Sequence, residues 1–131
     1  KKNKWYHTGD TGYLDKNKNL FLLRRIKDII IKGGININSK KIEDILMKDT
    51  NIKNVAVVGI KDKFYGERVA AFYSLKKKIN YKKTEINLKK LCALYLDTNH
   101  MPDFFIKKNY LELTKNGKVK KYLLKNTNLK Y

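Results

Sequence analysis

The feature that most constrains the fold is a pair of apolar runs near the middle of the chain. VAVVGI, residues 55–60, is short, uncharged and rich in β-branched side chains, as buried strands are. RVAAFYSL, residues 68–75, has the same character and follows the polar, glycine-containing segment DKFYGE, residues 62–67. We therefore predict two strands joined by a loop, in a domain built around a small sheet.

Helical spacing of apolar residues occurs on both sides of these strands. Ser39 is expected to be the N-cap of a helix in which Ile42, Ile45 and Leu46 share one face. Thr84 can cap a second helix. Its apolar stripe is Leu88, Leu91, Cys92, Leu94 and Tyr95. Strands and helices in this mixed order predict an α+β fold, a small sheet with packed helices.

The two ends of the chain add shorter elements. GYLDKNKNLFLLR, residues 12–24, reads as a β-hairpin around an Asp/Asn-rich turn. In KGGININ, residues 32–38, the paired glycines permit positive φ or the close approach of another backbone. Beyond the break at Met101-Pro102, FFI and YLEL are short strand candidates, and Val119, Leu123 and Leu124 mark a last short helix.

Length and composition indicate one folded domain. A chain of 131 residues with 42% hydrophobic residues can bury a single core. The lone cysteine, Cys92, excludes an intrachain disulfide and favours a reduced intracellular protein. No apolar run approaches the roughly 18 residues of a membrane span. The chain opens at Lys1 rather than Met, so we expect it to be a piece of a longer protein.

The net charge of +19 raises the question of nucleic-acid binding. Only three of the 31 basic residues are arginine, the side chain suited to bidentate contacts with bases. The lysines are spread along the chain among abundant Asn and Ile, a pattern typical of AT-rich coding. We therefore favour a solvated lysine surface, and keep a basic nucleic-acid-binding module as the alternative from another class.

Several common kinds of catalytic site are poorly supported. His7 and His100 are the only histidines, and neither has the spacing to Cys92 of a zinc site. Ser39 and Ser74 lie in a cap and a strand, without the context of a nucleophile elbow. NGKVK lacks the upstream glycine and the hydroxyl of a phosphate-binding Walker loop. No metal site is predicted.

Three segments are compatible with nucleotide chemistry. TGD, residues 8–10, places a carboxylate that can accept two ribose hydroxyls beside a flexible glycine. RRIKD, residues 24–28, precedes the paired glycines, and NGK, residues 116–118, places a lysine ammonium within reach of a phosphate. Each segment also has an ordinary explanation by itself. TGD could be a plain turn, RRIKD the end of a surface strand, and NGK a chance occurrence in a lysine-rich chain. Their order and spacing strengthen the set.

The segment WYHTGDTGYLDKNKNLFLLRRIKDIIIKGGININSKKIEDIL resembles the end of the adenylate-forming enzyme superfamily, which includes acyl-CoA synthetases, firefly luciferase and peptide-synthetase adenylation domains. That family has an aromatic-x-TGD, a D-x-x-G turn and then GR-x-x-D-x-I-x-x-G-G-x-N-I. VAVVGIKDKFYGERVAAF is similar to its AAVVGVPDEVYGEVVAAF, and LELTKNGKVKK to its LPRTxxGKxxR. The resemblance covers nearly the whole chain, with the motifs in order.

The resemblance implies a C-terminal fragment of an ATP-dependent acyl-CoA synthetase. Members have a large N-terminal domain and a small mobile C-terminal domain, so residues 1–26 would be the tail of the former and 27–131 the latter. A fatty or other carboxylic acid, ATP and coenzyme A would give acyl-CoA, AMP and pyrophosphate through an acyl-adenylate. Mg²⁺ would be bound mainly by the large domain. The full-length protein would be cytoplasmic or peripheral to a membrane, and this fragment alone inactive.

Site roles also follow from the resemblance, residue by residue. Asp10 of TGD would hold the ribose hydroxyls of AMP, and Arg25, the arginine of the family's GR, would contact the same nucleotide. Lys118 matches the lysine that contacts the substrate carboxylate and the α-phosphate during adenylation. It is the predicted catalytic residue.

Further matches imply a moving domain. Lys27 falls at the hinge about which the small domain turns. Gly33 and Gly34 match the loop that lines the pantetheine tunnel of coenzyme A when the thioester forms. One domain would then present two different surfaces in the two half-reactions. An acceptor other than coenzyme A, either a carrier-protein arm or oxygen, is the alternative within the superfamily.

Three positions depart from the family pattern. Arg24 replaces the glycine before the arginine, which could change the backbone there. Glu112 replaces the proline before the lysine loop and could change how Lys118 is presented. Asn36 stands where some members have arginine, so no phosphate contact is expected from it. These departures bear on efficiency more than on identity.

Overall fold

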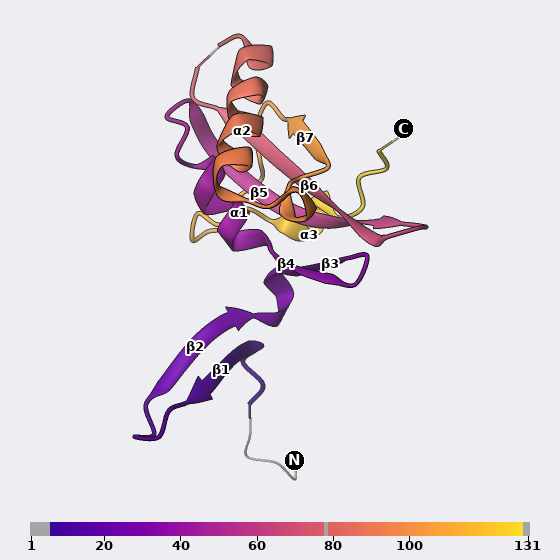
Figure 1. Ribbon diagram of the computed structural model, residues 1–131. Coiled ribbons are helices and arrows are strands. Elements are labelled where there is room, and N and C mark those ends of the chain that lie inside the picture. Colours follow the sequence, from indigo (N-terminus) through magenta and orange to yellow (C-terminus); the bar gives the residue numbers. More distant parts are fainter. Residues whose placement is uncertain (1–5, 78, 130–131) are drawn as a thin grey trace.

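The computed structural model describes residues 6–77 and 79–129. Its main part is built on a five-stranded sheet (Figure 1). The long strands β5 (Ile52–Asp62) and β6 (Gly66–Leu75) pair in antiparallel register from Ile52↔Leu75 to Asp62↔Gly66. β7 (Phe104–Lys107) runs parallel to β6 on its other edge. The expected α+β fold is confirmed, and the two predicted central strands are a single long hairpin.

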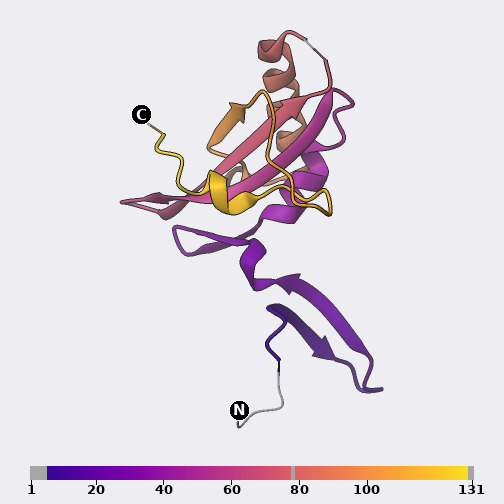
Figure 2. The ribbon, with the colours of Figure 1, turned by 180° about the vertical axis from the view of Figure 1, so that it is seen from behind.

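Both faces of this hairpin are covered, which explains why the middle of each strand is continuously apolar. Residues pointing to one face, such as Val57 and Ala71, pack with the helices α1 (Ser39–Leu46) and α2 (Tyr81–Tyr95). Residues pointing to the other face, such as Ala56 and Phe72, pack with the C-terminal segment and α3 (Lys121–Leu124). Figure 2 shows that segment crossing the sheet opposite the helices. Strands buried on both faces lose the alternation of half-exposed ones.

The N-cap of α1 and that of α2 are both asparagine, and neither is the residue expected from the sequence. The side chain of Asn38 accepts the backbone N–H groups of Lys40 and Lys41, so Ser39 is the first helical residue rather than the N-cap. The N-cap of α2 is Asn80, and Thr84 is buried inside the helix. Asparagine and serine are similarly good caps, so the apolar spacing alone left the first residue open.

A second hairpin, not assigned from the sequence, extends the sheet. β3 (Ile29–Lys32) and β4 (Ile35–Asn38) pair in antiparallel register and are joined by Gly33 and Gly34. Lys32 pairs with Gly66, which joins this hairpin to β6. The predicted YLEL strand is absent as a regular element, since Leu113 and Val119 form only an isolated bridge. The strand expected at FFI is β7, and the expected last helix is α3.

The N-terminal hairpin forms a separate sheet, as Figure 1 shows. β1 (Asp10–Leu14) and β2 (Leu20–Arg25) flank the expected Asp/Asn-rich turn, in which Asp15 accepts the backbone N–H groups of Asn17 and Asn19. A single 3₁₀ turn, η1 (Ile26–Asp28), leads from it to β3. The domain boundary predicted at residue 27 falls in this turn and stays a prediction. A second 3₁₀ turn, η2 (Thr98–His100), precedes Met101 and Pro102. None of the described helices is long and apolar enough to cross a bilayer.

Candidate functional site

The register of the N-terminal hairpin brings the two predicted nucleotide-contacting residues together. Asp10 lies directly opposite Arg25 in the ladder, and Arg25 Nε donates to Asp10 Oδ1 at 3.1 Å. Thr8 Oγ1 accepts the N–H of Asp10 at 3.3 Å, and Gly9 has a φ of +78°. An exposed ion pair of this kind contributes little stability. Its effect is to fix the orientation of a carboxylate that remains partly open to solvent.

The predicted hinge residue, Lys27, is exposed and lies in the middle of η1. The backbone N–H of Ile26 donates to the carbonyl of Gly9 at 2.8 Å, which ties the start of the turn to the N-terminal hairpin. Asp28, at its other end, is half-buried. The start of the turn is therefore tied to the N-terminal hairpin and its end leads directly into β3, with Lys27 between them.

Gly33 and Gly34 form the exposed tip of the β3–β4 hairpin. Their φ angles are +56° and +82°, as a two-residue turn between twisted antiparallel strands requires. A Cβ built on Gly34 would meet nothing within 4 Å, whereas one on Gly33 would lie 3.4 Å from Tyr65 Cδ1. The outer side of the tip is therefore open to the approach of a ligand.

The same hairpin is held firmly from behind. Gly33 N–H donates to the carbonyl of Tyr65, and Ile31 N–H to Glu67 Oε2, both at 2.8 Å. Lys32 Nζ lies 2.7 Å from Asp103 Oδ1, and both side chains are mostly buried. Asp103 Oδ2 also accepts the N–H of Val69. The glycine tip is thus anchored to the β5–β6 turn and to the start of β7.

Lys118 lies at the end of a compact loop that closes on itself. Lys118 N–H donates to Thr114 Oγ1 at 3.2 Å, and its carbonyl accepts the N–H of Thr114 at 2.7 Å. Gly117 has a φ of +80°, which allows the reversal of the chain. The Lys118 side chain is exposed. The Lys118 ammonium is therefore accessible to a ligand or to another domain on this side of the molecule.

The replacement of proline by Glu112 leaves the backbone of this loop hydrogen-bonded on both sides of the Leu113–Val119 bridge. The N–H of Lys120 donates to the carbonyl of Glu112 at 2.8 Å, and Lys120 Nζ lies 3.7 Å from Glu112 Oε2. Arg24, the second departure, lies opposite Thr11, next to a shift in register between Thr11 and Gly12. Neither departure interrupts the strand or loop that carries the neighbouring candidate residue.

A polar cluster around Lys121 was not found from the sequence. Lys121 Nζ lies 2.7 Å from Glu43 Oε1, 3.2 Å from Ser39 Oγ and 3.6 Å from Asp28 Oδ1. Glu43 is buried in α1 and also accepts the N–H of Val57 at 2.7 Å. These residues come from distant parts of the chain. Asp28 and Lys121 fall on the last positions of the quoted GR-x-x-D and GK-x-x-R motifs, but neither motif indicates that the two side chains meet. Glu43 is outside the quoted motifs, and its position on an apolar helix face was the signal available for it.

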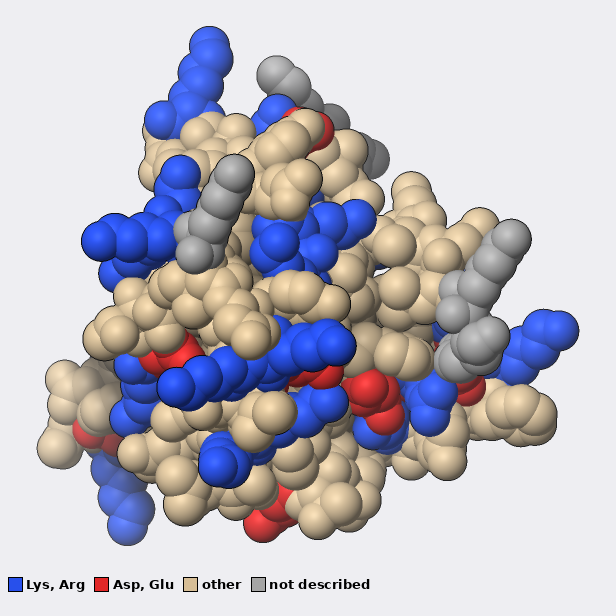
Figure 3. Space-filling view, turned by 90° about the horizontal axis from the view of Figure 1, so that it is seen from above, with Lys and Arg blue, Asp and Glu red and all other residues tan. Residues whose placement is uncertain are grey.

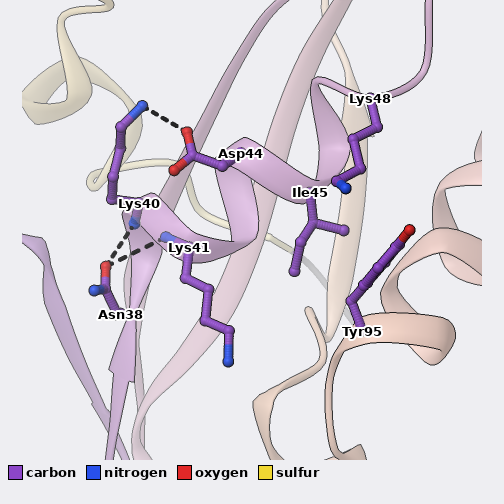
Figure 4. A pocket seen from close by; sticks show the side chains of 7 residues that line it. All are labelled: Asn38, Lys40, Lys41, Asp44, Ile45, Lys48 and Tyr95. Carbon is purple, nitrogen blue, oxygen red and sulfur yellow. Dashed lines mark hydrogen bonds and ion pairs between the residues drawn. The ribbon is translucent and has the colours of Figure 1, made fainter.

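A shallow cavity of about 460 Å³ lies apart from these residues, between α1 and the end of α2 (Figure 4). Lys40 Nζ is 2.8 Å from Asp44 Oδ1, and this hydrogen bond raises the pKa of Lys40. Lys48 Nζ lies over the ring of Tyr95, 4.4 Å from its centroid. Two of the lining lysines are therefore already engaged within the chain. None of the sequence-predicted site residues lines this cavity.

Charge and metal-ligating groups are dispersed over the described residues. Figure 3 shows Lys and Arg spread over one face with acidic side chains among them, not gathered into one tract. No group of three or more His, Cys, Asp or Glu within residues 6–77 and 79–129 lies close enough to hold a metal ion. His100 Nδ1 is 3.9 Å from Asp97 Oδ2.

Comparison with known proteins places these features in a family context. Residues 41–118 match the family model for the AMP-binding enzyme C-terminal domain. The 2-methylpropanoate–CoA ligase CCL4 of Humulus lupulus is 38% identical over 121 residues, which are 92% of this chain and 22% of that ligase. The chain thus spans about a fifth to a quarter of the length of the curated relatives that it matches.

Solved structures give the same result. An ATP-bound RpMatB-BxBclM chimera superposes with a TM-score of 0.76 at 31% identity, covering 90% of this chain and 24% of the chimera. The o-succinylbenzoate CoA synthetase of Bacillus subtilis, in complex with the intermediate OSB-AMP, gives 0.75 at 30% identity, covering 97% of this chain and 25% of the synthetase. In both proteins the matched part is a minor fraction of the whole chain.

Proposed function

Since the chain belongs to the AMP-binding enzyme C-terminal domain family, we propose that it is the C-terminal part of an ATP-dependent acyl-CoA synthetase. A carboxylate would attack the α-phosphorus of ATP and expel pyrophosphate, leaving an acyl-adenylate. The thiol of coenzyme A would then attack the acyl carbonyl, and AMP would leave. The observation that carries the proposal is the Lys118 loop: the family match ends on this residue, and its ammonium is exposed at the end of a hydrogen-bonded turn.

The N-terminal hairpin supports the division at residue 27. Its side chains include several exposed large apolar residues, among them Leu14, Leu20 and Leu22, and the rings of Tyr13 and Phe21 stack with centroids 5.2 Å apart. A two-stranded sheet is at best marginally stable alone in water. We therefore expect the hairpin to pack against a large domain, which the greater length of the relatives also implies.

Adenylation would depend on fixed charges around the nucleotide. Negative charge gathers at the α-phosphate as the carboxylate attacks, and the Lys118 ammonium would offset it. Asp10 would accept the ribose hydroxyls, with its carboxylate oriented by Arg25. Mg²⁺ would enter with ATP as part of the substrate and be held mainly by the large domain.

Thioester formation would use a different surface of the same domain. Rotation about Lys27 would withdraw Lys118 and bring the tip formed by Gly33 and Gly34 toward the acyl-adenylate. Because no side chain projects from that tip, the pantetheine arm could run along its backbone. Coenzyme A is the acceptor that we propose, and the intracellular location expected from the sequence stays a prediction.

The decisive test is Lys118→Ala in the full-length enzyme. Loss of one such charge is expected to slow ATP–pyrophosphate exchange by about 10²–10³-fold. Thioester formation from premade acyl-adenylate should be largely unchanged, because Lys118 has left the site by then. Lys115→Ala, which removes an exposed lysine from the same loop, is the matched control and should affect neither step. Equal loss of both half-reactions would reject the assignment.

A further inference from the structure

We propose that Lys121 is a positioning residue that fixes the Lys118 loop relative to the hinge and so governs adenylation. This inference rests on the proposed function. Lys121 is three residues beyond Lys118 and opens α3. Its ammonium contacts α1 and the end of the 3₁₀ turn that contains Lys27.

The contacts of Lys121 join three separate elements through one charge. The shortest, 2.7 Å to Glu43 Oε1, is a charge-assisted hydrogen bond, and Ser39 Oγ accepts a second at 3.2 Å. Asp28 Oδ1, at 3.6 Å, adds an electrostatic contact rather than a hydrogen bond. The Lys121 side chain is 28% exposed and that of Glu43 only 10%, so solvent and salt screen this pair less than a surface pair.

The loop needs such an anchor because its other supports give no fixed direction. α3 has only four residues, too few to be stable by itself. Val119 and Leu124 pack against the sheet, but apolar contacts tolerate sliding. The hydrogen bonds of the loop close it internally and do not tie it to α1. The ion pair of Lys121 with Glu43 supplies the directional link.

The contact of Lys121 with Asp28 connects the Lys118 loop to the hinge. Asp28 is the residue after Lys27 and lies on the small-domain side of the proposed hinge. Lys121 therefore links the hinge to the segment that carries Lys118. When the domain turns, the distance from the hinge to the loop that carries Lys118 stays constant, so this loop returns to the same place at each adenylation.

Removal of the Lys121 charge should loosen the loop without unfolding the domain. Glu43 keeps the hydrogen bond from Val57 N–H, and the apolar core is unchanged. The Gly33–Gly34 tip is held by a separate set of contacts around Asp103. A selective effect on the Lys118 half-reaction is therefore the expected signature.

The experiment compares Lys121→Ala with Lys121→Arg in the full-length enzyme. A misplaced catalytic group typically costs on the order of 10²-fold, so Lys121→Ala should slow ATP–pyrophosphate exchange by about 10–100-fold. The loss should appear in kcat, with little change in KM for ATP, and thioester formation from premade acyl-adenylate should be unaffected. Lys121→Arg keeps the charge and the reach to Glu43, and should restore most of the rate.

Lys40→Ala is the matched control. It also removes a lysine paired at 2.8 Å with an acidic residue of α1, but that pair is more than 60% exposed on both sides and contains no residue of the hinge or of the Lys118 loop. It should leave both half-reactions unchanged. If Lys121→Ala does not fold, as judged by thermal unfolding, Asp28→Asn tests the link to the hinge by itself. It should give a smaller loss that is still confined to adenylation.

The possible results distinguish the positioning role of Lys121 from a purely structural one. Unchanged exchange in Lys121→Ala, or equal slowing of both half-reactions, overturns the positioning role. An Asp28→Asn variant without any selective loss overturns the link to the hinge. Failure of the proposed function is distinguishable, because Lys118→Ala would then also leave ATP–pyrophosphate exchange unchanged.

Discussion

Among single residues, burial separates side chains that stabilise the fold from those available for chemistry. Cys92 is completely buried among apolar residues of α2 and the sheet, and this burial raises the pKa of its thiol to about 11. Lys118 and Gly34 are exposed, each at or next to a tight turn of the chain. Cysteine is a reactive residue type, but burial makes the Cys92 thiol unavailable for reaction in this fold. The residues with candidate functional roles lie at the exposed turns.

The Cys92 thiol is predicted to be inert in the folded protein. It should not react with Ellman's reagent at pH 8, and should react fully once urea unfolds the chain. Its pKa is raised from 9.0 to about 11, so its contribution to the free energy of unfolding is present below pH 9 and is lost as pH rises through 11. Cys92→Ala should remove that part of the loss. Rapid labelling of the native protein would contradict the buried position.

Among elements, the β3–β4 hairpin shows how a turn sets the position of a candidate site. Ile30 and Ile37 are cross-strand partners, and both are buried against the core. The glycine turn projects beyond them, where Tyr65 and the pair of Lys32 with Asp103 limit its movement. The backbone conformation of Gly33 and Gly34 therefore determines where the tip of the hairpin lies.

Gly34→Ala is predicted to destabilise this hairpin, whereas Gly33→Asn should be tolerated. Gly34 has a φ of +82°, and an L-residue in the left-handed region costs roughly 1–2 kcal/mol. Asparagine adopts that region readily in such turns, and a Cβ on Gly33 meets only an ordinary contact with Tyr65. Urea unfolding of the two variants measures the difference. Equal stability of Gly34→Ala and the parent would show that the turn adopts another conformation.

Across the whole molecule, two sheets are connected by one short turn. The N-terminal hairpin carries Asp10 and Arg25, and the larger unit carries the Gly33–Gly34 tip and Lys118. Only the larger unit has buried core clusters among the described residues. This arrangement agrees with the proposal that the hairpin belongs to a large domain and that the larger unit moves against it.

The 131-residue chain by itself is predicted to be inactive in adenylation. It contains the residues proposed to contact the nucleotide from one side, whereas the pocket for the acid is proposed to lie in the large domain. ATP–pyrophosphate exchange should therefore be at background level, while the full-length enzyme under the same conditions gives a signal. Exchange catalysed by this chain alone would contradict the assignment of the missing pocket to a large domain.

Local patterns predicted much of this structure. The uncharged runs at 55–60 and 68–75 are strands β5 and β6, and the spacing of Ile42, Ile45 and Leu46 gives the buried face of α1. The paired glycines adopt positive φ as expected. The N-caps at Asn38 and Asn80 were missed, because several neighbouring polar residues can cap a helix equally well.

By itself, the sequence determined the α+β class, the central strands and the motifs that point to adenylate chemistry. These depend on residue type and on spacing over a few positions. Only the tertiary structure decided that Asp28, Glu43 and Lys121 meet at one point, and that Lys32 and Asp103 brace the glycine tip. Such contacts arise where distant segments pack on the two faces and edges of one sheet, and no local pattern records which charges will face each other there.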